Sequence, residues 1–200
     1  MAVAEKKVVQ GRETRAALIS AAREIFGSQG FAATNTEQIA AKAGVTKGAV
    51  YHHFSGKDDL FCAVFEQVQL EISNRVSSVF MEPDAWDALV AGCGLWVDAH
   101  QTPEVQQIVL RDARSVLGAD VVRDLDVRFG AVSLRGALRK GMVAGVLDRQ
   151  PLRPLALMLA GALKEACLYV AEAEDHAEAR EEVALLITHL LGGLRAAPPV

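Results

Sequence analysis

Groups that donate hydrogen bonds gather in one short polar segment of the chain. The segment contains Thr46, Lys47, Tyr51, His52, His53 and Lys57. Hydroxyl, ammonium, phenol and imidazole groups donate to phosphate oxygens, and an ammonium also donates to O6 and N7 of guanine in the major groove. The segment therefore favours contact with a double-stranded nucleic acid, its phosphates and its base edges.

The two adjacent histidines, His52 and His53, also raise the possibility of a metal site. Neighbouring residues on a helix point about 100° apart and do not readily share an ion. No Cys or carboxylate is spaced to complete a ligand set. We therefore expect no metal here and no cofactor elsewhere.

Two short helices must position these donors. Gly44 marks the end of the first, because glycine enters the left-handed conformation without a Cβ penalty. Thr46 is suited to cap the second helix, which we expect over about Lys47 to Phe54, with Val50 and Phe54 buried on one side. Two helices joined by such a turn form a helix-turn-helix.

The start of the first of these two helices has two possible registers. Asn35 followed by Gln38 forms a capping box, and Thr34 followed by Glu37 is the competing choice. Either register starts the helix at this point.

Helical periodicity continues through the rest of the 200 residues, with no alternation typical of strands. We predict an all-α fold of about nine helices. Residues 1–11 form a flexible arm, 12–56 a three-helix helix-turn-helix domain, and 57–200 a helical ligand-binding and dimerisation domain entered by a long helix that ends before Pro83. The first helix runs from about Arg12 to Gln29.

Charge is divided unevenly between these parts. The net charge is −4, but residues 1–57 contain eight Lys and Arg against four Asp and Glu. A basic end suits phosphates. Three widely spaced cysteines and the lack of an apolar segment after the first lysines favour the cytoplasm.

The last two helices, over about 154–172 and 177–195, are apolar around most of their circumference. A surface helix needs only one apolar stripe, so we expect a second face to pack against another copy of the chain. The longest apolar run, residues 155–163, is far shorter than the about 20 residues needed to cross a bilayer, so no membrane partner is expected.

The larger domain also holds candidates for a ligand pocket. They are Trp86, Cys93, Trp96, His100, Arg111 and Phe129. Aromatic residues at helical spacing are more often core, and the arginine can pair with a nearby aspartate, so each candidate has a structural alternative. As a pocket, the set suits a mostly apolar small molecule with one or two polar groups.

The run from Ile25 to Phe65 resembles the DNA-binding segment of the TetR family of bacterial transcription regulators. The resemblance rests on Gly30-Phe31, Ile39-Ala40, Ala43-Gly44-Val45, Thr46-x-Gly48, Tyr51-x-His53-Phe54, Lys57 and Leu60. It implies a homodimer that binds a palindromic operator, usually as a repressor, and is released by a small effector.

The resemblance also assigns roles to single residues. Lys47, Gly48 and His52 match positions that face base edges. Thr46, Tyr51, His53 and Lys57 match positions that contact the DNA backbone, and Thr34 or Asn35 caps the second helix and touches phosphate.

Two other functions remain as alternatives. One is a DNA-binding regulator without an inducer. The other is a cytosolic helical enzyme, which we do not expect because no nucleophile elbow, phosphate loop, paired carboxylates or metal-ligand spacing occurs.

Overall fold

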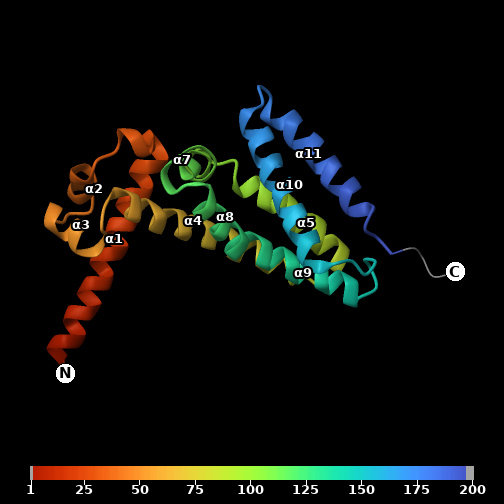
Figure 1. Ribbon diagram of the computed structural model, residues 1–200, viewed down its shortest axis with the longest axis horizontal. Coiled ribbons are helices and arrows are strands. Elements are labelled where there is room, and N and C mark those ends of the chain that lie inside the picture. Colours follow the sequence, from red (N-terminus) through yellow and green to blue (C-terminus); the bar gives the residue numbers. More distant parts are fainter. Residues whose placement is uncertain (1, 197–200) are drawn as a thin grey trace. The chain divides into compact units, whose positions relative to one another are not determined.

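The computed structural model describes residues 2–196, and the side chains of residues 8–196. Helices account for most of these residues, and no strand longer than an isolated bridge between Leu147 and Arg195 occurs among them. The elements are α1 (Ala2–Ala33), α2 (Thr36–Lys42), α3 (Lys47–His53), α4 (Lys57–Phe80), α5 (Ala85–Ala99), α6 (Pro103–Val105), η1 (Gln106–Asp112), α7 (Ala113–Leu117), α8 (Ala119–Asp126), η2 (Val127–Ala131), α9 (Val132–Val143), α10 (Leu152–Glu172) and α11 (His176–Gly192) (Figure 1). The all-α prediction is confirmed.

The segments η1 and η2 are π-helical and continue directly into the α-helical segments on either side of them. Counting each such run as one helix gives nine helices in the described part of the chain. These π-helical turns were not predicted, because over so few residues their spacing of apolar side chains cannot be distinguished from that of an α-helix.

Helix α1 is longer than predicted. It begins at Ala2, whereas we expected a flexible arm over residues 1–11 and a helix from about Arg12. Gly11 suggested a break, but glycine inside a helix costs only about 1 kcal/mol relative to alanine and does not end it. The helical path breaks where its end was predicted, because Gly30 has a φ of +79°, and one further turn reaches Ala33.

The chain folds as two compact units. The first contains Met1–Val68 and Pro103–Val122, and the second contains Gln69–Thr102 and Arg123–Val200. The sequence predicts one boundary at residue 56, with all of 57–200 in the larger domain. Residues 103–122 instead belong to the first unit, because the Asp112 carboxylate accepts a hydrogen bond of 2.8 Å from the Phe31 amide and Arg23 pairs with Glu104.

Three phenylalanines form the centre of the first unit. The Phe61 ring lies 5.1 Å from the Phe26 ring and 5.3 Å from the Phe31 ring, both edge to face. Leu18 on α1 and Ile39 on α2 are fully buried in the same unit. This cluster joins the start of α4 to the end of α1, and α2 and α3 both pack on α1.

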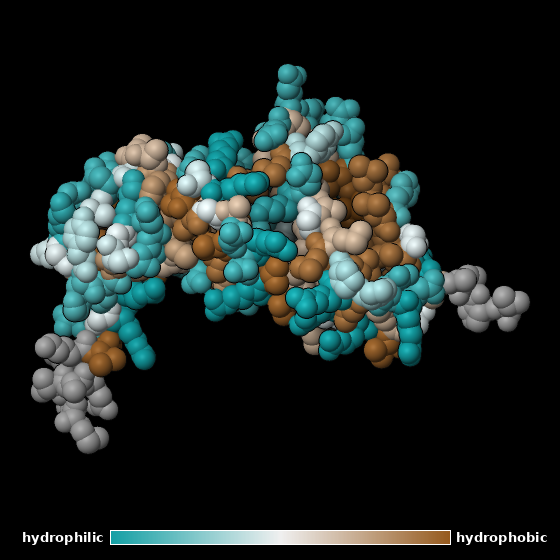
Figure 2. Space-filling view, in the orientation of Figure 1, coloured by the Kyte–Doolittle hydropathy of each residue, from teal (hydrophilic) through white to brown (hydrophobic). Residues whose placement is uncertain are grey.

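The second unit is a helical bundle in which α5, α9, α10 and α11 pack on one another (Figure 1). On both α10 and α11, one face is buried and the other is exposed to solvent. Cys167, Val170, Val183 and Leu191 are buried, whereas Met158, Tyr169, Leu186 and Leu190 are exposed. Figure 2 shows hydrophobic residues gathered on the surface over these two helices.

Helix α10 has a further property that the sequence reading did not anticipate. Within the described residues it is the one helix whose length and mean hydropathy, 1.4 over an 18-residue window, would allow it to cross a membrane. Only 22% of that window is buried. An apolar helix this exposed needs a partner for its outer face.

Candidate nucleic-acid interface and effector pocket

Helix α2 starts in the Asn35 register. The Asn35 side chain accepts from the Gln38 amide at 2.9 Å, and the Gln38 side chain accepts from the Asn35 amide at 2.9 Å. The capping box is therefore present, and the alternative through Thr34 and Glu37 is not adopted. Asn35 itself is exposed at the start of the helix.

The turn between α2 and α3 has the predicted chemistry. Gly44 has a φ of +67°, the left-handed region in which glycine carries no Cβ penalty. The Thr46 hydroxyl accepts from the Ala49 amide at 3.3 Å and caps α3. These two residues fix where α3 begins, and they leave its outer face clear of the protein core.

Two of the predicted DNA contacts hold the end of α1 instead of projecting freely. The buried Thr34 donates its hydroxyl to the Gly30 carbonyl at 2.7 Å, so its side chain is not on the exposed surface. The Lys57 ammonium donates to the carbonyls of Phe31 and Thr34, each at 2.8 Å, and lies 3.9 Å from the centre of the Phe31 ring. An ammonium has three donors, so Lys57 keeps one for another acceptor.

The other predicted DNA contacts lie on or beside the outer face of α3. Thr46, Lys47, Gly48, Tyr51 and His52 are exposed, and His53 is half-buried. The Tyr51 hydroxyl lies 3.3 Å from the Thr36 hydroxyl, which fixes the direction of the phenol. The structure therefore brings these donors together, as the sequence predicted.

Lys47 has a partner that the sequence did not reveal. Its ammonium forms an ion pair with the carboxylate of Glu37 on α2. This hydrogen bond lowers the pKa of Glu37 and raises the pKa of Lys47, so both groups stay charged near neutral pH. Both side chains are more than half exposed, so DNA can compete for the lysine.

The rings of His52 and His53 lie 5.1 Å apart at an angle of 74°. Among the residues whose side chains are described, no group of three or more His, Cys, Asp or Glu gathers as metal ligands would. The two imidazoles are placed as hydrogen-bond donors or acceptors beside the other polar groups of α3.

The predicted pocket residues do not form one cluster. Arg111 is exposed and belongs to the first unit. Trp86 lies under the Arg195 guanidinium, 4.3 Å from the ring centre, and Phe129 lies beside Arg128. These three residues therefore have surface or packing roles, which were the structural alternatives that the sequence left open.

The remaining three candidates lie close together on α5 and at its end. Cys93 and Trp96 line a cavity of about 10 Å³. The buried His100 carries a hydrogen on Nδ1, which donates to the Trp96 carbonyl at 2.8 Å. Burial lowers the pKa of His100, so the imidazole is neutral near pH 7.

A polar cluster next to these residues was missed by the sequence reading. The Gln69 amide donates to Asp126 Oδ1 at 3.1 Å, and the other carboxylate oxygen of Asp126 pairs with Lys164. A signal was present, because Gln69 follows Phe65 by four residues and is therefore a polar residue on the buried stripe of α4.

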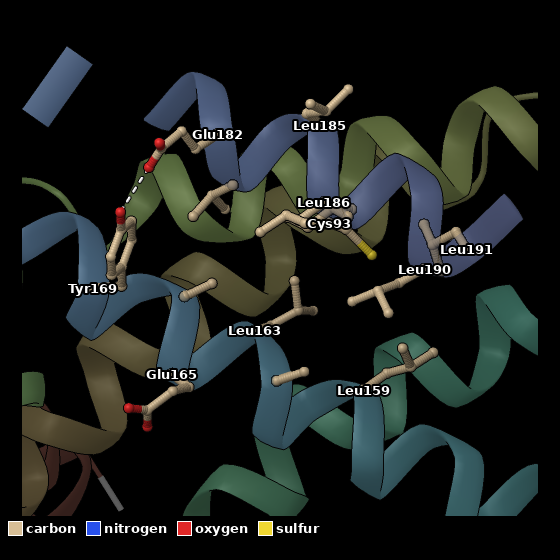
Figure 3. Close-up of a pocket in the computed structure, with 14 residues that line it drawn as sticks. Cys93, Leu159, Leu163, Glu165, Tyr169, Glu182, Leu185, Leu186, Leu190 and Leu191 are labelled. Carbon is tan, nitrogen blue, oxygen red and sulfur yellow. Dashed lines mark hydrogen bonds between the residues drawn. The ribbon is translucent and has the colours of Figure 1, made fainter. Parts of the chain in front are cut away.

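A larger, apolar groove of about 690 Å³ opens between α10 and α11 (Figure 3). Its lining includes Cys93, Leu159, Leu163, Leu186, Leu190 and Leu191. At one end, the Tyr169 hydroxyl donates to Glu182 at 2.6 Å and bridges the two helices. The groove is almost devoid of polar atoms, so it suits another apolar surface.

A capped helix-turn-helix with an exposed row of donors, joined to a larger helical bundle, defines a DNA-binding transcriptional regulator. Comparisons with known proteins agree. Residues 18–64 match the model of bacterial regulatory proteins of the tetR family, and residues 86–194 match a tetracyclin repressor-like C-terminal domain. The chain belongs to the TetR family and is a regulator of transcription, not an enzyme.

Individual relatives support this assignment. The chain is 36% identical over 105 residues to the HTH-type regulator TtgW of Pseudomonas putida, which is 52% of this chain and 76% of that protein. It is 30% identical to TtgR of the same organism over 70% of this chain and 73% of that protein. A TetR-family regulator from Pectobacterium atrosepticum has a TM-score of 0.85 and 33% identity, covering 96% of this chain and 98% of the other.

Proposed function

We propose that this regulator is a cytoplasmic repressor that binds a palindromic operator as a homodimer and releases it when a small, mostly apolar effector binds to the second unit. The observation that carries the proposal is that the chain has two surfaces of different chemistry, each without a partner in the single chain. One is the donor-rich outer face of α3, and the other is the apolar groove between α10 and α11.

The outer face of α3 is suited to the major groove of DNA. Lys47 and His52 reach base edges, and Gly48 lets the backbone approach closely. Thr46, Tyr51 and His53, with Asn35 at the start of α2, donate to phosphates and fix the register. Lys57 contributes its third donor to a phosphate while it holds the end of α1.

Lys47 must exchange its protein partner for DNA in this scheme. Its ion pair with Glu37 is exposed, and such pairs contribute about 0 to 1 kcal/mol. A guanine offers two acceptors to the same ammonium, so replacing the Glu37 carboxylate with guanine costs little free energy. In the free protein, Glu37 holds the Lys47 ammonium beside α2.

Exposed apolar side chains of α10 and α11 support the homodimer. Leu185, Leu186 and Leu190 on α11 each expose more than half of their surface, and Met158 on α10 exposes 72%. A second copy presents the same residues, so two such pairs of helices form a four-helix contact around a two-fold axis. The two α3 helices of the dimer must then meet major grooves about 34 to 36 Å apart.

A membrane is the other environment that would cover an apolar helix such as α10. The lining of the groove argues against this, because it includes Glu165 on α10 and Glu182 on α11. Ionised groups at these positions are costly in a bilayer but are accommodated at the rim of a protein interface.

The small size of the internal cavity favours a second candidate, a regulator without an inducer. A cavity of about 10 Å³ holds no effector unless side chains move. The two candidates share DNA binding and dimerisation and differ in whether any compound lowers the affinity for DNA.

A mobility-shift titration on the promoter next to the gene tests the proposal. With six or more phosphate contacts per dimer, log K should fall with log salt at a slope of about −0.9 per contact. Sedimentation equilibrium on the same sample should give a dimer. A monomer without affinity for duplex DNA at low salt would refute the proposal, and a compound panel added to the bound complex separates the two candidates.

A further inference from the structure

The core of the second unit holds a hydrogen-bond acceptor that lacks a donor. Gln69 on α4 exposes 1% of its surface. Its Oε1 is the one fully buried side-chain nitrogen or oxygen without a partner in the part of the chain that the structure describes. Buried polar atoms are nearly always paired in native proteins. The atom therefore points to a missing donor.

The orientation of the Gln69 amide is fixed by its neighbours. Its nitrogen donates to Asp126 Oδ1 at 3.1 Å. A flipped amide would place Oε1 against the carboxylate and leave the nitrogen without an acceptor. The other oxygen of Asp126 pairs with Lys164, so Oδ1 is the oxygen that accepts the amide hydrogen. Oε1 is therefore an acceptor that lacks a donor.

His100 belongs to the same cluster and adds no donor. Its Nδ1 hydrogen is used by the Trp96 carbonyl, which leaves Nε2 as an acceptor. Burial lowers the pKa of this imidazole and keeps it neutral, while the charge of Asp126 raises that pKa and the charge of Lys164 lowers it. Gln69 Oε1 and His100 Nε2 are therefore both acceptors, and the charges of Asp126 and Lys164 cancel each other.

The same four helical runs also line the apolar cavity beside Trp96. Each run carries one residue of the polar cluster and, further along the same run, two residues that line the cavity. The sets are Gln69 with Val76 and Phe80, His100 with Cys93 and Trp96, Asp126 with Gly130 and Leu134, and Lys164 with Ala160 and Leu163. The polar cluster and the apolar cavity are therefore successive layers of one bundle.

Trp96 occupies the space that a ligand would need. The indole packs directly on Gly130 of the π-helical segment η2, where an added Cβ would lie 2.7 Å from Trp96 Cη2. The cavity that remains has the volume of about one water molecule. π-helical turns occur often at functional sites, and this one places a glycine under the indole. A ring-sized ligand can enter only if Trp96 moves.

We propose that the effector is a neutral, mostly apolar molecule with one hydroxyl or N–H group, which displaces the Trp96 indole and donates a hydrogen bond to Gln69 Oε1. This inference rests on the proposed function, because it names the class of effector for the same regulator. A cation or an anion is disfavoured, since Asp126 and Lys164 already neutralise each other and no unpaired charge faces the cavity among the groups described above.

The test uses two probes of nearly equal shape, p-cresol and p-xylene, which differ in a hydroxyl and a methyl group. Calorimetric titration measures both with the full-length protein and with the variants Gln69→Met and Gln150→Leu. Gln69→Met keeps the length of the side chain and removes the acceptor. Gln150 is exposed, so its variant is the matched control for a lost glutamine.

We expect p-cresol to bind the parent protein and the Gln150→Leu control. In Gln69→Met, the affinity of p-cresol relative to that of p-xylene should fall by about tenfold, because the hydroxyl loses its buried acceptor. An unchanged ratio of the two affinities would refute the assignment of Gln69. Failure of p-cresol to bind the parent protein would refute the class of effector and leave a buried water as the partner of Oε1.

A second variant, Trp96→Phe, tests the same site if Gln69→Met folds poorly. Trp96→Phe shortens the side chain that fills the cavity, so p-cresol should bind several-fold more tightly. Unchanged affinity would refute the role of Trp96. DNA binding by the unliganded parent protein is measured separately, so a failure there counts against the proposed function and not against the effector site.

Discussion

Shortening Leu190 on α11 should weaken the proposed homodimer by a calculable amount. Leu190 exposes 59% of its surface in the single chain. Burying a whole leucine side chain contributes about 2 kcal/mol, so covering this exposed fraction contributes about 1.2 kcal/mol in each copy. Two-fold symmetry doubles the effect, which gives about 2 to 3 kcal/mol for Leu190→Ala, or a rise of about 30- to 150-fold in the dimer Kd.

Sedimentation equilibrium over a range of protein concentrations measures this Kd. Val143→Ala is the matched control, because Val143 exposes 84% of its surface but lies at the end of α9, outside the groove. The control should keep the parent Kd. A Leu190→Ala protein with the Kd of the parent would show that the dimer forms through another surface, and the reasoning from the groove would be wrong.

The three other predictions concern single polar groups. Lys57→Met removes two hydrogen bonds from the end of α1 and should lower the free energy of unfolding by about 1 to 3 kcal/mol, measured by urea denaturation. Glu37→Gln frees Lys47 and removes a negative charge beside the DNA, so operator affinity in a mobility-shift assay should rise several-fold at low salt. Folding lowers the pKa of His100 from 6.5, so below about pH 6.5 the unfolded chain binds more protons than the folded one. The parent protein should therefore lose stability as the pH falls below about 6.5. In thermal melts, His100→Gln should reduce that loss.

Each of these expectations can fail in a recognisable way. Unchanged unfolding of Lys57→Met would mean that water replaces the ammonium at both carbonyls. Weaker DNA binding by Glu37→Gln would mean that the carboxylate positions Lys47 rather than competing for it. A His100→Gln protein with the same pH dependence as the parent would assign the acid sensitivity to other groups.

The DNA-binding elements could be predicted from sequence because their signals are local. Asn35 and Gln38 cap each other within one turn, Thr46 caps α3, and Gly44 ends α2. Such signals depend on neighbouring residues and on backbone sterics, so the same pattern gives the same structure in different surroundings. The extension of α1 to Ala2 was not predicted, because Gly11 was interpreted as the start of the helix and glycine is in fact tolerated inside it.

Other features depend on contacts between distant segments and have no local signal. The pairing of Asp112 with the Phe31 amide joins residues 81 positions apart and moves the boundary between the units. The ion pair of Lys47 with Glu37 and the position of Trp86 under Arg195 are of the same kind. Gln69 is the exception, because a polar residue on a buried helical stripe can be recognised from spacing alone.

Cys93 and Leu163 form a wall that is shared by the internal cavity and the groove between α10 and α11. A molecule that pushes this wall outward reshapes the surface that another subunit meets. Coupling between two equilibria is reciprocal, so effector affinity should then depend on protein concentration. Titrations of p-cresol above and below the dimer Kd should differ, and identical curves would show that the two faces of the wall act independently.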